Sequence, residues 1–145
     1  MGERYLKSIR LLAECMQGFE RLSGEHVRKH GLTHAQFDII ATLGNTEGMS
    51  YKELGEKTLI TKGTLTGVIE RLEQKGLVER ERSLDDKRSW FIRLTPKGDR
   101  MFRDVFPQVV SEGSAVFAHF TENDFAALEQ TLSGLKQVIA AGSDS

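Results

Sequence analysis

The chain has 145 residues, with 20 basic and 21 acidic side chains, one cysteine and 39% hydrophobic residues, so it fits a single domain over residues 1–145 that is able to bury a core. Its longest run without a formal charge, residues 113–121, is far shorter than the roughly 18 to 20 apolar residues that span a membrane. Charged residues interrupt the N-terminus where a signal peptide would be apolar, and we therefore expect a cytoplasmic protein with no membrane partner.

The first thirty residues have the apolar spacing of an amphipathic helix. The residues that share its apolar face are Tyr5, Ile9, Leu12, Met16 and Phe19. Gly31 can adopt the left-handed conformation that commonly ends a helix. The sequence therefore predicts a helix over residues 1–31.

Two capping patterns follow this helix. A hydroxyl residue followed three positions later by an acid or amide can satisfy free backbone donors at the start of a helix. This spacing occurs at Thr33 with Gln36 and at Ser50 with Glu53. We therefore expect short helices over residues 33–43 and 51–57.

A third short helix is predicted over residues 61–75. Thr61 can act as its N-cap, and Gly76 can end it. The residues that share its apolar face are Leu65, Val68, Ile69 and Leu72. The three helices are therefore joined by short connections.

The period then changes from that of a helix to that of strands. Residues 78–82 and 90–94 have the alternation of two short strands, and the residues between them form a polar turn. The pattern predicts a β-hairpin whose tip carries Asp86, Lys87 and Arg88.

Two further amphipathic helices complete the chain. Thr95 and Pro96 mark the start of the first, because the missing N–H of a proline costs nothing at the first helical position, and its apolar spacing continues to Phe120. Thr121 can cap the last helix, and residues 142–145 are expected to fray. The apolar residues of this last helix, spaced as in helices that pack on partner helices, are Phe125, Leu128, Leu132, Leu135 and Ile139.

This order of elements predicts a mainly α fold with a small β-hairpin wing. Two short helices joined by a tight connection form a helix-turn-helix, and a hairpin after them makes a winged helix-turn-helix, here over residues 33–98. The flanking helices, residues 1–31 and 99–141, carry more apolar surface than one small module can cover. We therefore expect them to be dimerisation helices, with an intramolecular bundle as the alternative.

A winged helix of this kind suggests DNA binding. Gly63 and Gly67 occupy the first two turns of the helix that begins at Thr61, where each costs about 1 kcal/mol relative to alanine, and close approach to a duplex would account for them. Threonine hydroxyls reach base edges or phosphates, and free N–H groups at a helix start favour phosphate oxygens. Lys62 adds a positive charge at this end.

The hairpin tip and the charge distribution fit the same interpretation. Lys87 and Arg88 would meet the adjacent minor groove, whose narrow A·T regions attract arginine, and Asp86 would orient Arg88; a solvated turn is the alternative. The isoelectric point near 6.4 is low for a nucleic-acid-binding domain. Residues 50–100, however, hold 12 basic and 9 acidic side chains, a net charge of +3 that leaves −4 elsewhere.

Three stretches resemble the multiple antibiotic resistance regulator (MarR) family of bacterial winged-helix repressors. They are LEQKGLVER at residues 72–80, DKRSWFIRLTPKG at residues 86–98 and LTHAQF at residues 32–37. The similarity extends over nearly the whole chain in the order and length of the elements. It implies an obligate homodimer whose two winged helices bind a pseudo-palindromic operator, often released by a small ligand.

Carried over by position, the resemblance places the recognition helix at Thr61 and a DNA-contacting pair on the wing at Asp86 and Arg88. The expected DNA-binding residues are Thr61, Lys62, Gly63, Thr64, Thr66, Arg71, Asp86, Lys87 and Arg88. The chain is then a sequence-specific transcriptional regulator, and a repressor, with double-stranded DNA and a second copy of itself as partners. The residues that would bind an effector are not identified.

Two side hypotheses concern the cysteine and the histidines. A hydroperoxide-sensing branch of the family keeps a reactive cysteine at the place of Cys15, but the supporting tyrosines are replaced here by His34 and Phe37, so an apolar core residue is the other interpretation. His26 and His30 have the spacing of a metal-binding pair, but neighbouring positive charges oppose a cation. We therefore predict no metal site and no cofactor.

The sequence also lacks the patterns of catalysis. It contains no nucleophile elbow, phosphate-binding glycine loop, dinucleotide fingerprint or paired catalytic acids in a suitable context, so we expect no catalytic residues and no enzyme. The alternative to a DNA-binding regulator is a winged-helix module in which the helix at Thr61 contacts another protein.

Overall fold

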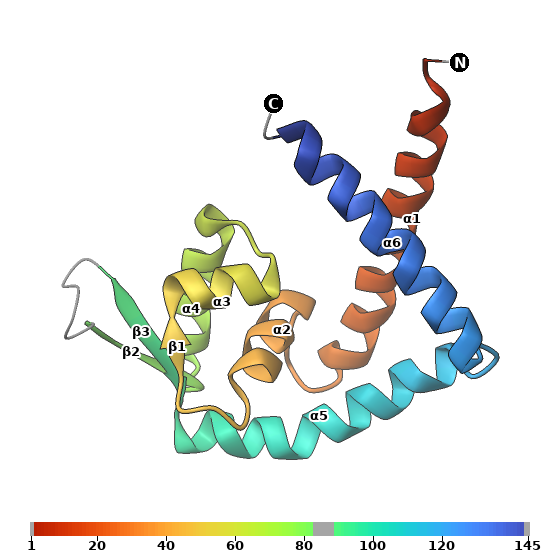
Figure 1. Cartoon of the computed structure of the whole chain (residues 1–145). Helices are drawn as coiled ribbons and strands as arrows, with labels where there is room; N and C mark the ends of the chain where they lie inside the picture. Colours follow the sequence, from red (N-terminus) through yellow and green to blue (C-terminus); the bar gives the residue numbers. More distant parts are fainter. Residues whose placement is uncertain (1, 83–88, 144–145) are drawn as a thin grey trace. The chain divides into compact units, whose positions relative to one another are not determined.

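The computed structural model describes residues 2–82 and 89–143 (Figure 1). Contacts divide the chain into two compact units, Met1–Val110 and Ser111–Ser145, and each unit is described by itself. In chain order the elements are α1 (Arg4–Arg28), α2 (His34–Leu43), β1 (Met49–Ser50), α3 (Tyr51–Thr58), α4 (Lys62–Gln74), β2 (Val78–Arg82), β3 (Trp90–Leu94), α5 (Pro96–Val116) and α6 (Glu122–Ser143). The mainly α fold with a small β wing is confirmed.

Capping residues start α2 and α3 at the predicted places. The Gln36 N–H donates to Thr33 Oγ1 and the Thr33 N–H donates to Gln36 Oε1, both at 3.1 Å, which confirms the first capping box. The second box forms only in part: the Glu53 N–H donates to Ser50 Oγ at 3.1 Å, while the Glu53 carboxylate pairs with Lys57. The second box is incomplete because the Glu53 carboxylate pairs with the Lys57 ammonium and not with the Ser50 N–H.

Glycines end α1 and α4 as predicted. Gly31 and Gly76 have φ angles of 77° and 74°, which only glycine adopts without strain. After α4, the Leu77 N–H donates to the Leu72 carbonyl at 3.0 Å and the Gly76 N–H donates to the Glu73 carbonyl at 2.9 Å. These two bonds form a Schellman motif, so the backbone itself determines the residue at which α4 ends.

The sheet contains a strand that the sequence analysis missed. β2 and β3 form the predicted antiparallel hairpin, with Arg82 opposite Trp90. β1 adds to the other edge of β3, with Met49 opposite Ile92, and gives the order β1-β3-β2. Two residues are too short to show an alternating pattern, so only the pairing with β3 reveals this strand.

The core of the first unit lies between α2, α3, α4 and the sheet. The predicted apolar face of α4 is confirmed, because Leu65, Ile69 and Leu72 are at most 2% exposed. The other most deeply buried side chains are Val27, Ile39, Ile40, Leu43, Leu54, Leu77, Val78 and Ile92. Packing of this one face leaves the opposite face of α4 in solvent.

Polar and aromatic contacts join α1 to α2. His34 Nδ1 lies 2.9 Å from Ser23 Oγ, and the His34 ring meets Phe19 edge to face at 6.2 Å. Burial raises the pKa of the Asp38 carboxyl, one turn after His34, and the charge of His34 opposes this rise. His34 is therefore engaged in packing the two helices together.

Two predicted helix ends in the C-terminal part of the chain differ in the structure. α5 continues through Pro107 but ends at Val116, not at Phe120. Phe117, Phe120 and Phe125 gather at the turn instead, with ring centroids 5.1 to 6.2 Å apart, and this aromatic cluster accounts for the early end. Thr121 caps α6 as predicted, and α6 runs to Ser143, beyond the expected start of fraying.

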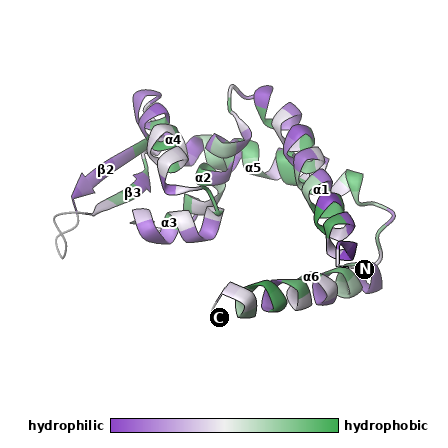
Figure 2. Ribbon diagram, turned by 90° about the horizontal axis from the view of Figure 1, so that it is seen from above, coloured by the Kyte–Doolittle hydropathy of each residue, from purple (hydrophilic) through white to green (hydrophobic). Residues whose placement is uncertain are grey.

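Long apolar faces remain uncovered in each unit. On α1, Tyr5 is 62% exposed and Met16 51% exposed, and Cys15 is also exposed, so the core interpretation of Cys15 is wrong for a single chain. None of the 22 residues of α6, all within the described part, is buried. Figure 2 shows apolar residues along both helices. Within the described residues, no helix combines the length and hydrophobicity that crossing a membrane requires.

Candidate nucleic-acid interface

α3 and α4 form a helix-turn-helix joined by residues 59–61. The inner face of α4 is held in the core by Leu65, Ile69 and Leu72. The predicted site residues of this region, all exposed, are Thr61, Lys62, Gly63, Thr64, Thr66 and Arg71. Every residue of the predicted helical part of the site is therefore accessible.

The polar groups in the first turn of α4 form only some of the hydrogen bonds that they could form. Thr61 stands at the N-cap position, but its hydroxyl donates to Thr64 Oγ1 at 3.2 Å, and no side chain of the described residues caps the backbone. Thr61 therefore takes the predicted N-cap position, but its side chain does not cap the helix. The N–H groups of the first turn stay available to an anion such as a phosphate oxygen.

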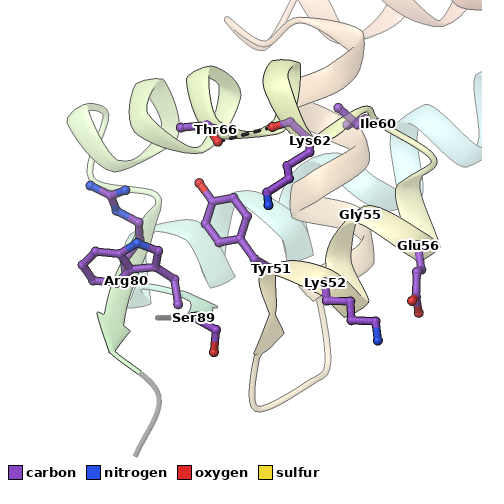
Figure 3. Close-up of a pocket in the computed structure, with 10 residues that line it drawn as sticks. Tyr51, Lys52, Gly55, Glu56, Ile60, Lys62, Thr66, Arg80 and Ser89 are labelled. Atoms are coloured by element: carbon purple, nitrogen blue, oxygen red, sulfur yellow. Dashed lines mark hydrogen bonds between the residues drawn. The ribbon is translucent and has the colours of Figure 1, made fainter. Parts of the chain in front are cut away.

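The predicted residues lie on two flanks of α4. At about 100° per residue, Thr64 and Arg71 share one flank, whereas Lys62 and Thr66 share the flank toward the wing. Thr66 Oγ1 donates to the Lys62 carbonyl at 3.3 Å, as the dashed line in Figure 3 shows. Gly63 lies between the two flanks. Because glycine has no side chain, nothing projects from the surface at this point.

A pocket of about 630 Å³ opens beside the second flank. Its lining residues come from α3, the turn, α4 and the wing strands, and they are Tyr51, Lys52, Gly55, Glu56, Ile60, Lys62, Thr66, Arg80, Ser89 and Trp90. Figure 3 shows the Tyr51 hydroxyl and the Lys62 ammonium on the side of the pocket below α4. The lining has three cationic side chains and one carboxylate, that of Glu56, together with hydroxyl groups and an aromatic wall, so its net charge suits an anion.

Two guanidinium groups lie over the Trp90 ring, which forms the aromatic wall of the pocket. The Arg80 guanidinium lies 4.8 Å and that of Arg82 4.2 Å from the centre of the Trp90 ring, within cation–π range. Arg80 also reaches the Glu73 carboxylate on α4 at 3.1 Å. Burial lowers the pKa of Arg80, but Glu73 and Tyr51 more than offset this, so its pKa is raised. The charged Arg80 thus joins α4 to the wing.

The opposite face of the hairpin is held by ion pairs. Arg93 on β3 donates to Glu79 at 2.7 Å and to Glu81, both on β2. Hydrogen bonds to these two carboxylates raise the pKa of Arg93. The pairs stand across adjacent strands on one face, so they help to fix the base of the wing.

Asp86, Lys87 and Arg88 fall outside the described residues. Sequence reasoning did not identify Tyr51 and Arg80, which line the pocket beside α4, because neither belongs to the recognition helix or the wing tip. The helix-turn-helix pattern could have indicated Tyr51, since Tyr51 begins α3 and residues of α3 and α4 line the same pocket.

Comparisons with known proteins agree with this geometry. The model of the MarR family matches residues 32–90. The HTH-type transcriptional regulator SarZ of Staphylococcus haemolyticus is 31% identical over 119 residues, which make up 82% of this chain and 78% of SarZ. The HTH-type transcriptional regulator MhqR of Bacillus subtilis is 29% identical over 124 residues, 86% of each chain. These relatives are transcriptional regulators, a class distinct from enzymes.

A solved structure extends the similarity to three dimensions. A mutant MarR from E. coli complexed with operator DNA matches with a TM-score of 0.79 and 26% identity, over 93% of this chain and 97% of that one. The match spans both the winged helix-turn-helix and the flanking helices.

Proposed function

Because this chain belongs to the MarR family of transcriptional regulators, we propose that it is a homodimeric, sequence-specific repressor that occupies a pseudo-palindromic operator. The observation that carries the proposal is α4, whose inner face is fixed in the core while its outer face is exposed and, in its N-terminal half, has small and hydroxylated residues. The operator complex of the E. coli relative supports it. The two recognition helices would enter major grooves about 34 Å apart.

The residues divide by role in this proposal. Thr61, Thr64 and Thr66 contact base edges and phosphates, and Gly63 allows close approach. Lys62 and Arg71 supply charge on the two flanks. Asp86, Lys87 and Arg88 belong to the wing and meet the minor groove. The pocket beside Tyr51 takes backbone phosphate, since its cations and hydroxyl groups match an anion.

The proposed dimer would cover the exposed apolar faces. α6 has no buried residue along its length in the described chain, and α1 leaves large apolar side chains in solvent. Exposed apolar surface on this scale is rare in monomers and marks an interface. A small ligand that binds the dimer and changes the spacing of the recognition helices would then release the operator.

The proposal is tested by fluorescence anisotropy against duplexes that tile the region upstream of the gene, with random duplex as competitor. We expect one segment to bind at least about 10³-fold more tightly than random DNA. Lys62→Met is expected to weaken binding to both and to lower the slope of log affinity against log salt by about 1, because one phosphate contact is lost.

Arg103→Met is the matched control, since it also removes one positive charge but lies on α5, where Arg103 pairs with Asp99 at 2.9 Å. It should leave binding and salt slope unchanged. Uniform weak binding to all duplexes would contradict the repressor and favour the protein-interaction module.

Replacing Gly63 on α4 with alanine should raise the free energy of unfolding and lower the affinity for operator DNA. No described atom lies within 4 Å of a Cβ placed on Gly63, so the fold itself does not need glycine there. Gly63→Ala is expected to raise the free energy of unfolding by about 1 kcal/mol. The same methyl group should lower operator affinity about tenfold, because it stands between α4 and the duplex. Urea denaturation and anisotropy measure the two effects.

Gly134→Ala on α6 serves as the control for this pair of effects. A Cβ at Gly134 also meets no described atom within 4 Å, so the variant should gain similar stability with operator affinity unchanged. Unchanged operator affinity in Gly63→Ala would show that the duplex does not approach this part of α4.

A further inference from the structure

The C-terminal end of α4 is held by a group of long-range hydrogen bonds. The Lys75 ammonium donates to the Gly31 carbonyl at 2.8 Å and to Gln36 Oε1 at 3.0 Å. The Lys97 ammonium donates to the Lys75 carbonyl at 2.9 Å. The end of α4 is thus tied to the α1–α2 connection on one side and to the start of α5 on the other.

Gln36 makes this attachment rigid. Its side chain belongs to the capping box of α2, where Oε1 accepts from the Thr33 N–H at 3.1 Å, and Gln36 is only 5% exposed. Lys75 therefore bonds to an acceptor that is already fixed by the backbone of α2. Holding the acceptor in place reduces the entropy lost when a flexible lysine bonds to it.

Because α4 is long, a small tilt at its C-terminal end displaces its N-terminal end. A helix of 13 residues is about 20 Å long, so a tilt of about 5° at the C-terminal end moves the N-terminal end by roughly 2 Å. Hydrogen bonds weaken steeply over smaller displacements. Contacts made by Thr61 or Thr64 therefore depend on how the far end of α4 is anchored.

We propose that Lys75 is a positioning residue for DNA recognition: its bonds to Gly31 and Gln36 set the angle at which α4 meets the duplex, without contact between Lys75 and DNA. The inference rests on the proposed function. It also gives a role to the Lys75-Gly76-Leu77 segment, which lies outside the predicted DNA-contacting residues.

The test compares Lys75→Met with Lys62→Met in the wild-type background. Lys75→Met keeps the aliphatic stem and removes the ammonium. We expect about a tenfold loss of operator affinity, the size of one lost base contact, with affinity for random duplex and the salt slope unchanged. Lys62→Met should instead weaken both and lower the slope. Lys75→Arg should restore most of the operator affinity, because its guanidinium can donate to both acceptors.

Hydrogen exchange gives a second readout that does not require DNA. Lys75→Met should speed exchange of the Leu77 amide, which donates to Leu72 at the end of α4, at least about fivefold, while the amides of α6 stay unchanged. A lower salt slope in Lys75→Met would overturn the proposal by showing a phosphate contact. Unchanged operator affinity would also overturn it. If the wild type shows no sequence preference, the proposed function fails, and unchanged exchange at Leu77 would then overturn the anchoring role separately.

Discussion

Replacing Gly98 with alanine is expected to destabilise the winged-helix unit by about 3 kcal/mol, as overpacking against a fixed backbone does. A Cβ at Gly98 would lie 2.0 Å from the Leu77 carbonyl oxygen and 3.2 Å from Leu94 Cδ2. The Leu77 carbonyl cannot move freely, because it accepts from the Thr95 N–H at 3.1 Å. The start of α5 would therefore have to separate from the end of α4. Urea denaturation followed by circular dichroism measures the loss.

Gly113→Ala on the same helix is the matched control. No described atom lies within 4 Å of a Cβ at Gly113, so alanine should raise the free energy of unfolding by about 0.5 to 1 kcal/mol through helix propensity alone. A loss below about 1 kcal/mol in Gly98→Ala would mean that α5 and the Leu77 carbonyl do not approach as closely in solution.

Charges on the apolar face of α6 are expected to separate the proposed dimer. Leu128→Lys combined with Leu132→Lys places two ammonium groups on a face that includes Leu135 and Ile139, and burying unpaired charges in an interface is strongly unfavourable. The variant should be monomeric in sedimentation equilibrium. Operator affinity should fall at least about a hundredfold, because two linked recognition helices bind with an effective concentration that a monomer lacks.

The control carries the same two charges on the other side of α6. At about 100° per residue, Gln130 and Gln137 lie opposite Leu128 and Leu132, so Gln130→Lys with Gln137→Lys should stay dimeric and bind the operator as the wild type does. A double leucine variant that remains dimeric would show that α6 does not form the interface. Dimer loss without loss of operator affinity would show that one winged helix suffices.

Much of the fold followed from the sequence because its signals are local. The capping box of Thr33 and Gln36 and the glycine end at Gly76 each depend on a few adjacent residues. The period of Leu65, Ile69 and Leu72 defined which face of α4 enters the core, and so which face carries the candidate site. Within the described residues, that outer face matches the sequence prediction.

Only the tertiary structure decided the contacts between residues that are far apart in the chain. β1 is a strand because Met49 pairs with Ile92, and two residues carry no period of their own. The pocket beside Tyr51 forms where the start of α3 meets the wing. In the sequence, Lys75 is simply a charged residue at the end of a predicted helix. Folding brings its ammonium to Gln36, 39 positions earlier. Local spacing sets each helix and its faces, whereas packing alone determines which faces and ends meet.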